Sequence, residues 1–149
     1  MIDKERTYNR IIKILEENKA TYKLFNHKAA FTYNELQTVQ KEAGFVGIEG
    51  KCLVIKKKNS FVVCITIEGK KLNFAKLKEI SDDNKIRLAT SDELQEYFGA
   101  EPGCAYPFGF AEDISIYIDP IVYEQEWFLF SPLYPTKTIQ IKGNNLKTI

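Results

Sequence analysis

The stretch from Tyr97 to Phe110 constrains the fold most, because it places three glycines and two prolines among fourteen residues. Glycine reaches backbone angles that other residues avoid and proline fixes φ, so few paths are open to this backbone. Tyr106, Phe108 and Phe110 are interleaved with them, whereas a flexible spacer is rich in Ser, Lys and Glu and poor in aromatic rings. We therefore expect a packed loop that forms one wall of a binding site.

The length and composition fit one globular domain spanning residues 1–149. With 149 residues, 44% of them hydrophobic, the chain can hide roughly 70% of the surface that its unfolded form exposes. No apolar run is long enough to cross a membrane, and the charged, amphipathic N-terminus differs from a secretory signal. We expect a cytoplasmic protein that makes no membrane contact.

Cysteine and histidine are too sparse for a metal site. Cys52, Cys64 and Cys104 stand far apart without a C-x-x-C pair, and the chain has one histidine, so we expect neither a zinc site nor another cofactor. The formal net charge of +1 lacks the strong basic excess that is typical of a nucleic-acid-binding domain. An RNA partner would therefore have to be held by a local patch.

Hydrophobic periodicity and capping signals predict short helices and strands in mixed order. We expect helices over residues 3–19, 32–43 (opened by a capping box of Thr32 and Glu35), 73–80 and 91–98 (opened by Thr90 and Glu93), and strands over 21–25, 51–58, 60–67, 85–89, 114–118, 126–130 and 138–141. The strands at 51–58 and 60–67 should form a hairpin. Because a regular βαβ alternation is missing, we predict an α+β fold with a central mixed, largely antiparallel sheet flanked by helices.

Lys51 is the first candidate for chemistry, because we expect it to begin a strand and to project its ammonium group into a neighbouring cleft. The alternative is a solvated surface lysine, since lysine side chains are mostly exposed. The second candidate is Gly103-x-x-x-Pro107, a turn that can present backbone N–H and C=O groups to a ligand. The alternative here is a packed turn that only ends a helix.

Cys104 could act as a nucleophile if a neighbouring base lowered the pKa of its thiol. His27 is the one histidine that could serve as this base, and the sequence does not place the two side chains together. The simpler interpretation is a buried structural thiol and a hydrogen-bonded histidine. Asp119 precedes Pro120, so its carboxylate can cap a turn, with a role in a pocket as the alternative.

Several of these segments together resemble the YbaK and prolyl-tRNA-synthetase-associated editing domain family. The resemblance is carried by the run from Gly99 to Gly109, by Lys51-Cys52-Leu53-Val54 before it, by Ile114 to Asp119 after it, and by His27 with Thr32 as a His-x-x-x-x-Thr segment. It implies an α+β domain with a central mixed sheet that hydrolyses mischarged aminoacyl-tRNA. The usual substrate of the family would be a tRNA for proline that carries alanine, cysteine or another small amino acid.

The resemblance also implies roles for individual residues. Lys51 matches the family's functional lysine, and Gly103 and Pro107 match a Gly-x-x-x-Pro loop whose backbone groups orient the aminoacyl carbonyl. The 2′-hydroxyl of the terminal ribose would assist water, so that no protein nucleophile is needed. The implied partners are a mischarged tRNA and an aminoacyl-tRNA synthetase. The implied substrate-binding residues are His27, Thr32, Cys52, Cys104, Ala105, Tyr106, Asp119, Ser131 and Thr136.

Three positions depart from the family pattern. The family's His-Pro-x-x-Asn-Thr run is Ser131-Pro132-Leu133-Tyr134-Pro135-Thr136 here, so that Ser131 replaces the histidine, Pro135 replaces the asparagine, and both side-chain donors are lost. Cys52 follows the lysine where Asn, Ser or Thr is common.

Three hypotheses for the function follow from the sequence. The first is a trans-editing aminoacyl-tRNA deacylase, the second is a non-catalytic module that binds tRNA or an aminoacyl-adenosine, and the third is a thiol-dependent hydrolase that uses Cys104.

Overall fold

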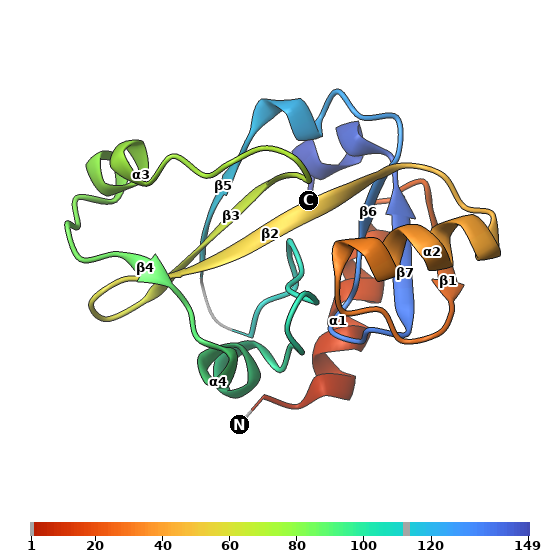
Figure 1. The fold of residues 1–149 in the computed structure, drawn as a ribbon, viewed down its shortest axis with the longest axis horizontal. Coiled ribbons are helices and arrows are strands. Elements are labelled where there is room, and N and C mark those ends of the chain that lie inside the picture. The colour runs from red at the N-terminus through yellow and green to blue at the C-terminus, as the bar shows by residue number, and fades with distance from the viewer. Residues whose placement is uncertain (1, 112–113) are drawn as a thin grey trace.

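The computed structural model of the protein describes residues 2–111 and 114–149. Figure 1 shows the long strand β2 crossing the molecule, with α1, α2 and β7 near one of its ends and α3 and β4 near the other. The helices are α1 (Lys4–Glu17), α2 (Tyr33–Ala43), α3 (Phe74–Ser81) and α4 (Ser91–Glu93), which continues as a π-helical turn over Leu94–Phe98. The strands are β1 (Tyr22–Asn26), β2 (Ile48–Lys56), β3 (Phe61–Ile67), β4 (Arg87–Leu88), β5 (Ser115–Ile118), β6 (Phe128–Phe130) and β7 (Lys137–Ile141), and short 3-10 turns cover Pro120–Val122 and Gly143–Lys147.

Local capping signals set the bounds of the helices. The Asp3 carboxylate accepts a hydrogen bond from Arg6 N at 3.0 Å to begin α1, whose buried residues Thr7, Ile11 and Leu15 form one stripe. Thr32 Oγ1 caps α2, which ends at Gly44 with φ +74°. The predictions of these helices are confirmed. Among the described residues, no helix has both the length and the apolar character needed to span a membrane.

The sheet is mixed, as predicted, and runs in the order β1-β7-β6-β2-β3-β5, with β4 paired to β2. The β2–β3 hairpin is antiparallel from Gly50 opposite Ile67 to Lys56 opposite Phe61. The pairs β1–β7, β6–β7 and β2–β4 are also antiparallel, whereas β2–β6 and β3–β5 are parallel. The α+β prediction with a largely antiparallel mixed sheet is therefore confirmed.

The start of β2 was predicted wrongly. The strand begins at Ile48 and not at Lys51, so Lys51 lies inside it. The reason is that Ile48 and Glu49 pair with Phe128 and Leu129 of β6, far along the chain. Local sequence cannot reveal such a partner, and it is this partner that extends the strand.

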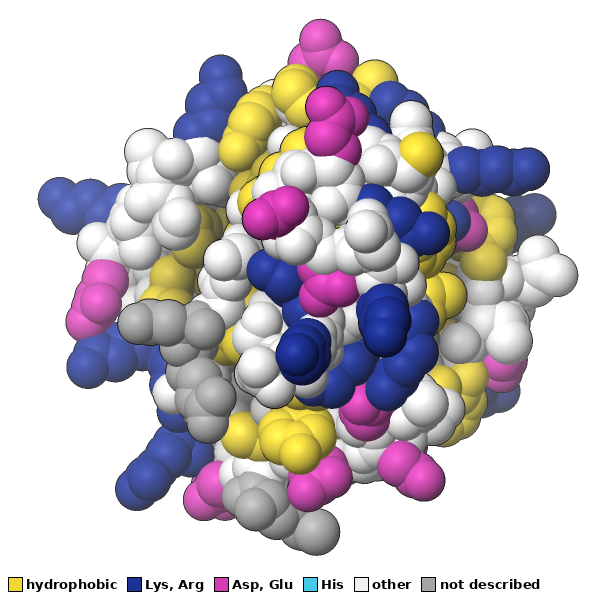
Figure 2. All heavy atoms as spheres, turned by 90° about the vertical axis from the view of Figure 1, so that its left-hand side faces the viewer, with side chains coloured by type: hydrophobic (Ala, Val, Ile, Leu, Met, Phe, Trp, Pro, Cys, Tyr) yellow, Lys and Arg dark blue, Asp and Glu magenta, His cyan; other side chains and the backbone are white. Residues whose placement is uncertain are grey.

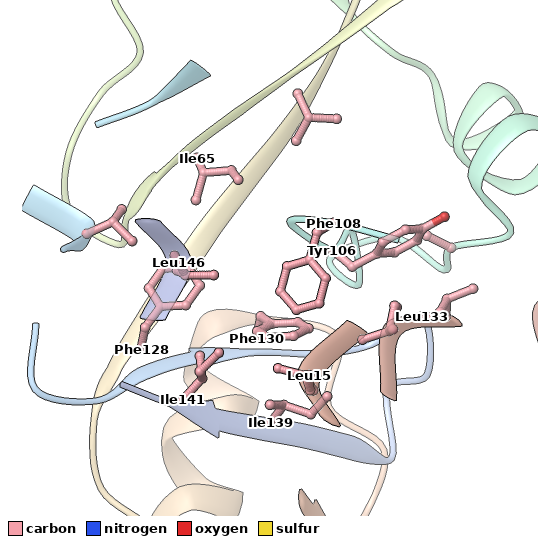
Figure 3. Packing of buried hydrophobic residues seen from close by; sticks show 14 of the residues in the cluster. Leu15, Ile65, Tyr106, Phe108, Phe128, Phe130, Leu133, Ile139, Ile141 and Leu146 are labelled. Carbon is pink, nitrogen blue, oxygen red and sulfur yellow. The ribbon is translucent and has the colours of Figure 1, made fainter. Parts of the chain in front are cut away.

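The glycine- and proline-rich loop after α4 is packed against the main core, as predicted. Figure 3 shows Tyr106 and Phe108 of this loop beside Phe130 and close to the other buried side chains. The Phe108 and Phe130 rings meet edge to face with centroids 5.6 Å apart, and the Tyr106 hydroxyl donates to the Phe98 carbonyl at 2.8 Å. Gly109 has φ +90°, and an added Cβ would lie 2.7 Å from Ile11 Cγ1. This half of the loop is therefore part of the core.

Candidate active site

A pocket of about 330 Å³ opens where three parts of the chain meet. Its walls come from β2, from the segment that leads into α2, and from the first half of the glycine- and proline-rich loop. Five of the predicted site residues line it, namely Lys51, Cys52, Gly103, Ala105 and Ser131. The fold thus brings together residues that lie up to eighty positions apart in the sequence.

The pocket lies at a gap along one edge of β2. One edge of the strand pairs with β3, while the other pairs with β6 at Ile48 and Glu49 and with β4 at Ile55 and Lys56. Ile48 N donates to Trp127 O and Val54 O accepts from Ala89 N, so the even-numbered residues direct their backbone groups away from β3. Cys52 lies between these two pairings and lines the pocket. Its backbone N–H and C=O therefore face the cavity.

Gly103 closes the loop side of the pocket. Its φ is +81°, in the left-handed region, and an added Cβ would stand 2.7 Å from the backbone oxygen of Phe31. Only glycine fits without strain so close to the segment before α2. Ala105 continues this wall, which is therefore built mostly of backbone and small side chains.

Lys51 contributes the ammonium group of the pocket. The side chain is half-buried and donates from Nζ to the Lys70 carbonyl at 3.2 Å. Its position inside β2, opposite Thr66 of β3, holds its backbone rigidly in the sheet. A ligand oxygen can replace the carbonyl as acceptor, because the ammonium group has three donors.

Sequence reasoning missed the acidic residues of the pocket. Glu49 is 7% exposed and lines the cavity together with Glu68. Burial raises the pKa of Glu49 to about 8, and the nearby Glu68 carboxylate adds to the shift. Nothing in the sequence indicates that Glu49 is buried, because the strand was predicted to begin two residues later, at Lys51. The burial of Glu49 depends on the pairing of β2 with β6.

Ser131 and Pro135, which replace His and Asn of the family pattern, have different environments. Ser131 follows β6, is 3% exposed and lines the pocket, and its Oγ has no hydrogen-bond partner among the described residues. The Pro135 carbonyl accepts from Ala30 N at 2.9 Å and so ties the C-terminal segment to the one before α2. Ser131 therefore borders the pocket, whereas the backbone of Pro135 connects two segments outside the pocket lining.

Three predicted binding residues lie near the β1–β7 side of the sheet and outside the pocket lining. His27 Nδ1 lies 2.7 Å from the Lys28 carbonyl, which can only accept, so Nδ1 donates to it, and Nε2 is hydrogen-bonded with Thr138 Oγ1 at 2.7 Å. The exposed Thr136 accepts from His27 N through its carbonyl at 2.9 Å, and the exposed Thr32 caps α2. Each of these residues therefore makes hydrogen bonds that stabilise the fold.

The core half of the loop holds three further predicted residues. Cys104 is fully buried, as are Tyr106 and Pro107, and the three do not line the pocket. Burial raises the pKa of the Cys104 thiol to about 12, with Glu101 and Glu49 adding to it. The protonated thiol and the separately bonded His27 remove the basis for the hypothesis of a thiol-dependent hydrolase.

Asp119 belongs to a different cluster. It accepts hydrogen bonds from Thr66 Oγ1 at 2.9 Å and Ile121 N at 3.1 Å, and it pairs with Lys70 Nζ at 3.0 Å. The turn-capping interpretation is thus confirmed. Within residues 2–111 and 114–149, no group of three or more His, Cys, Asp or Glu side chains is arranged to hold a metal ion.

Comparison with known proteins identifies relatives by sequence. The profile of one family, the aminoacyl-tRNA editing domain, matches residues 27–149. The proline–tRNA ligase of Bacillus velezensis is 32% identical over 91 residues, a match that covers 58% of this chain and 16% of the ligase. The prolyl-tRNA editing protein ProX of Acetoanaerobium sticklandii is 24% identical over 103 residues, covering 69% of this chain and 63% of that protein. The match thus spans only about a sixth of the ligase.

Solved structures show the same fold. The crystal structure of one hypothetical protein has a TM-score of 0.78 at 16% identity and covers 93% of this chain and 92% of its own. A protein described as a candidate trans-editing enzyme for prolyl tRNA synthetase has a TM-score of 0.76 at 20% identity, with 94% and 88% covered. At these identities the likeness establishes the architecture.

Proposed function

This chain belongs to the aminoacyl-tRNA editing domain family, and we propose that it hydrolyses the ester of a mischarged tRNA, acting in trans on tRNA for proline or a related tRNA that carries a small amino acid. The observation that carries the proposal is the joint position of Lys51 and Gly103 in one pocket of this family's fold. The names of the related proline–tRNA ligase and of the editing protein ProX support the choice of tRNA.

The chemistry needs positioning more than a protein nucleophile. The scissile bond joins the aminoacyl carbonyl to a ribose oxygen of the terminal adenosine, and water attacks the carbonyl carbon to give an oxyanion before the ribose oxygen leaves with a proton. Lys51 and the backbone groups of Cys52 and of the loop from Gly103 to Ala105 would orient the carbonyl and stabilise the oxyanion. The ribose 2′-hydroxyl would position the water. Pro107 would act through the shape of the loop, because it is buried away from the cavity.

The size of the pocket supports a small amino acid. A cavity of about 330 Å³ is at the lower end of the range for ligand sites, and it has to accept the carbonyl and part of the ribose as well as the side chain. Leu36, Leu53 and Leu94 line it with apolar surface. A large or charged side chain would have to displace these walls.

The surface around the pocket supports a nucleic-acid partner. Residues 51–87 contain ten Lys and Arg against four Asp and Glu, a net charge of +6, whereas the remainder, with eleven against sixteen, carries −5. Figure 2 shows Lys and Arg side chains gathered on the face formed by α3, β4 and the tip of the β2–β3 hairpin. Phe31 and Tyr33 at the pocket are 47% and 45% exposed. Positive charge on this face and exposed aromatic rings at the pocket suit phosphates and stacked bases respectively.

Deacylation of a panel of mischarged tRNAs tests the proposal. Lys51→Ala should lower kcat/KM by about 100-fold or more through loss of oxyanion stabilisation, while the free energy of unfolding changes by less than about 1 kcal/mol. Lys13→Ala is the matched control, because Lys13 lies on α1 and makes an exposed pair with Glu17. Absence of hydrolysis with every tRNA, or a Lys51→Ala variant as active as the parent, would contradict the proposal.

A second candidate is a non-catalytic binding module of the same fold. Ser131 favours it, because a buried hydroxyl without a partner stands where the resembling family has histidine. Binding of a non-hydrolysable aminoacyl-adenosine analogue without turnover of any ester substrate would support this alternative over the deacylase.

A further inference from the structure

Glu49 occupies a position that the sheet imposes. Gly50 pairs with Ile67 across the β2–β3 hairpin, and one step further Glu68 N donates to Glu49 O at 2.9 Å. Glu68, the first residue after β3, is therefore directly opposite Glu49 of β2, a position at which Cβ atoms are about 5 Å apart. Both line the pocket.

The Glu49 carboxyl group has no hydrogen-bond or ion-pair partner among residues 2–111 and 114–149. It is 7% exposed, yet it forms neither a side-chain hydrogen bond nor an ion pair with any residue that the structure describes. Lys51, two positions along the strand, directs its Nζ to the Lys70 carbonyl instead. Burying an unpaired carboxyl group costs free energy. A ligand that donated a hydrogen bond to Glu49 would offset this cost.

The pocket also shows that it is built for a polar ligand. Ser131 lines the same cavity and is 3% exposed, and its buried Oγ has no hydrogen-bond partner in the described part of the chain. Burial and the neighbouring Glu68 disfavour the ionised form of Glu49 in the free protein, and a cationic group in the pocket would stabilise that ionised form. Because no group of three or more His, Cys, Asp or Glu side chains within the described residues is arranged to hold a metal ion, the two carboxyl groups suit an ammonium ion better.

We propose that Glu49 binds the α-ammonium group of the aminoacyl ligand, with Glu68 reinforcing the negative field, so that the pocket selects amino acids with a free amino group. This inference rests on the proposed function in one respect, namely that the ligand is an aminoacyl ester. It extends that function to a substrate class, because N-acylated and peptidyl esters lack the ammonium group and would leave Glu49 buried and unpaired. The ammonium group has three donors and matches an acceptor-only carboxylate.

Binding of two amide-linked analogues, 3′-alanylamino-3′-deoxyadenosine and its N-acetyl form, tests the inference by calorimetry. Wild-type protein should bind the free-amino analogue at least about ten-fold more tightly, as expected for a charge-assisted hydrogen bond. Glu49→Gln should bring this ratio to within about three-fold of one. The matched control Glu126→Gln, which removes the charge of an exposed glutamate outside the pocket, should keep it.

Equal binding of the two analogues by wild type, no measurable binding of either, or an unchanged ratio in Glu49→Gln would overturn the inference. The outcome is separable from that of the proposed function. A free-amino preference that Glu49→Gln abolishes, together with no hydrolysis of any mischarged tRNA, would retain the ammonium site and reject the deacylase. Hydrolysis of mischarged tRNA without an amino-group preference would do the reverse.

Discussion

Glu49 lies near the start of β2 and Asp119 directly after β5, two strands of one sheet that are separated by β3. The two carboxyl groups differ in their hydrogen-bond partners and in their burial. Asp119, directly after β5, accepts hydrogen bonds from Thr66 and from Ile121 N and pairs with Lys70. Glu49, in β2, has no such partner among the described residues and is more deeply buried. Both were available to sequence reasoning, which chose Asp119 as a substrate-binding residue and did not consider Glu49.

The contrast shows in the acidity of the two carboxyl groups. Burial tends to raise the pKa of Asp119, but the hydrogen bonds from Ile121 N, Lys70 and Thr66 outweigh it and lower the pKa below its ordinary value. Burial raises the pKa of Glu49 to about 8, and Glu68 acts in the same direction. A carboxylate whose partners lie within the fold stabilises the fold, whereas one without partners is available to a ligand.

The largest expected effect is on stability as a function of pH in Glu49→Gln. Because the folded pKa of about 8 exceeds the ordinary 4.5, the unfolded chain loses its proton first and wild-type stability falls as pH rises from about 4.5 to 8. The variant lacks this term, so its stability relative to wild type should grow by on the order of 4 kcal/mol across that window. Urea denaturation at pH 4.5, 6.5 and 8.5 measures it. Parallel pH profiles would contradict a raised pKa of Glu49 in the folded protein.

Asp119→Ala should give the next largest effect, with the opposite pH dependence. Loss of the three interactions should destabilise the protein by about 2 kcal/mol at pH 7. Since the folded pKa is lowered, this loss should disappear as pH falls below the ordinary aspartate range, where wild type also loses the charge. The rate of deacylation, measured well below the unfolding temperature, should stay within about three-fold of wild type. A much larger fall in kcat with unchanged stability would instead place Asp119 in the site.

The smallest expected effects on stability are those of removing two buried hydroxyl groups, one with a hydrogen-bond partner and one without a described partner. Thr66→Val removes a donor to Asp119 and should cost about 1 to 2 kcal/mol, whereas Ser131→Ala removes a hydroxyl without a described partner and should change stability by less than about 0.5 kcal/mol or raise it. Thermal unfolding of the two variants in parallel provides the comparison. Binding of the amide-linked analogue should respond in the reverse order. Equal stability losses would mean that Ser131 is already satisfied.

Much of the local structure followed from the sequence, because it depends on neighbouring residues. The first helix lies within its predicted range of residues 3–19, and the second begins at the Thr32 cap and ends before Gly44 as predicted. The hairpin from β2 to β3 and the packed loop around Tyr106 also agree with the local patterns. These features are set by steric limits on glycine and proline, by side-chain caps and by the spacing of apolar residues.

The site was predictable only in part. A motif identifies candidate residues, but it does not identify the residues that form hydrogen bonds with them in the folded protein. Lys51 and Gly103 do line one pocket, while the partners that occupy His27 and Asp119 come from other strands.

The sequence by itself therefore determined the helices, the hairpin and the glycine-shaped wall, since each is encoded within a few residues. Only the tertiary structure decided that β2 extends to Ile48, that Glu49 is buried there, and that Ser131 Oγ lacks a partner in the described chain. The physical reason is that burial and hydrogen bonding depend on which strands pair, and β6 reaches β2 only after the chain has folded.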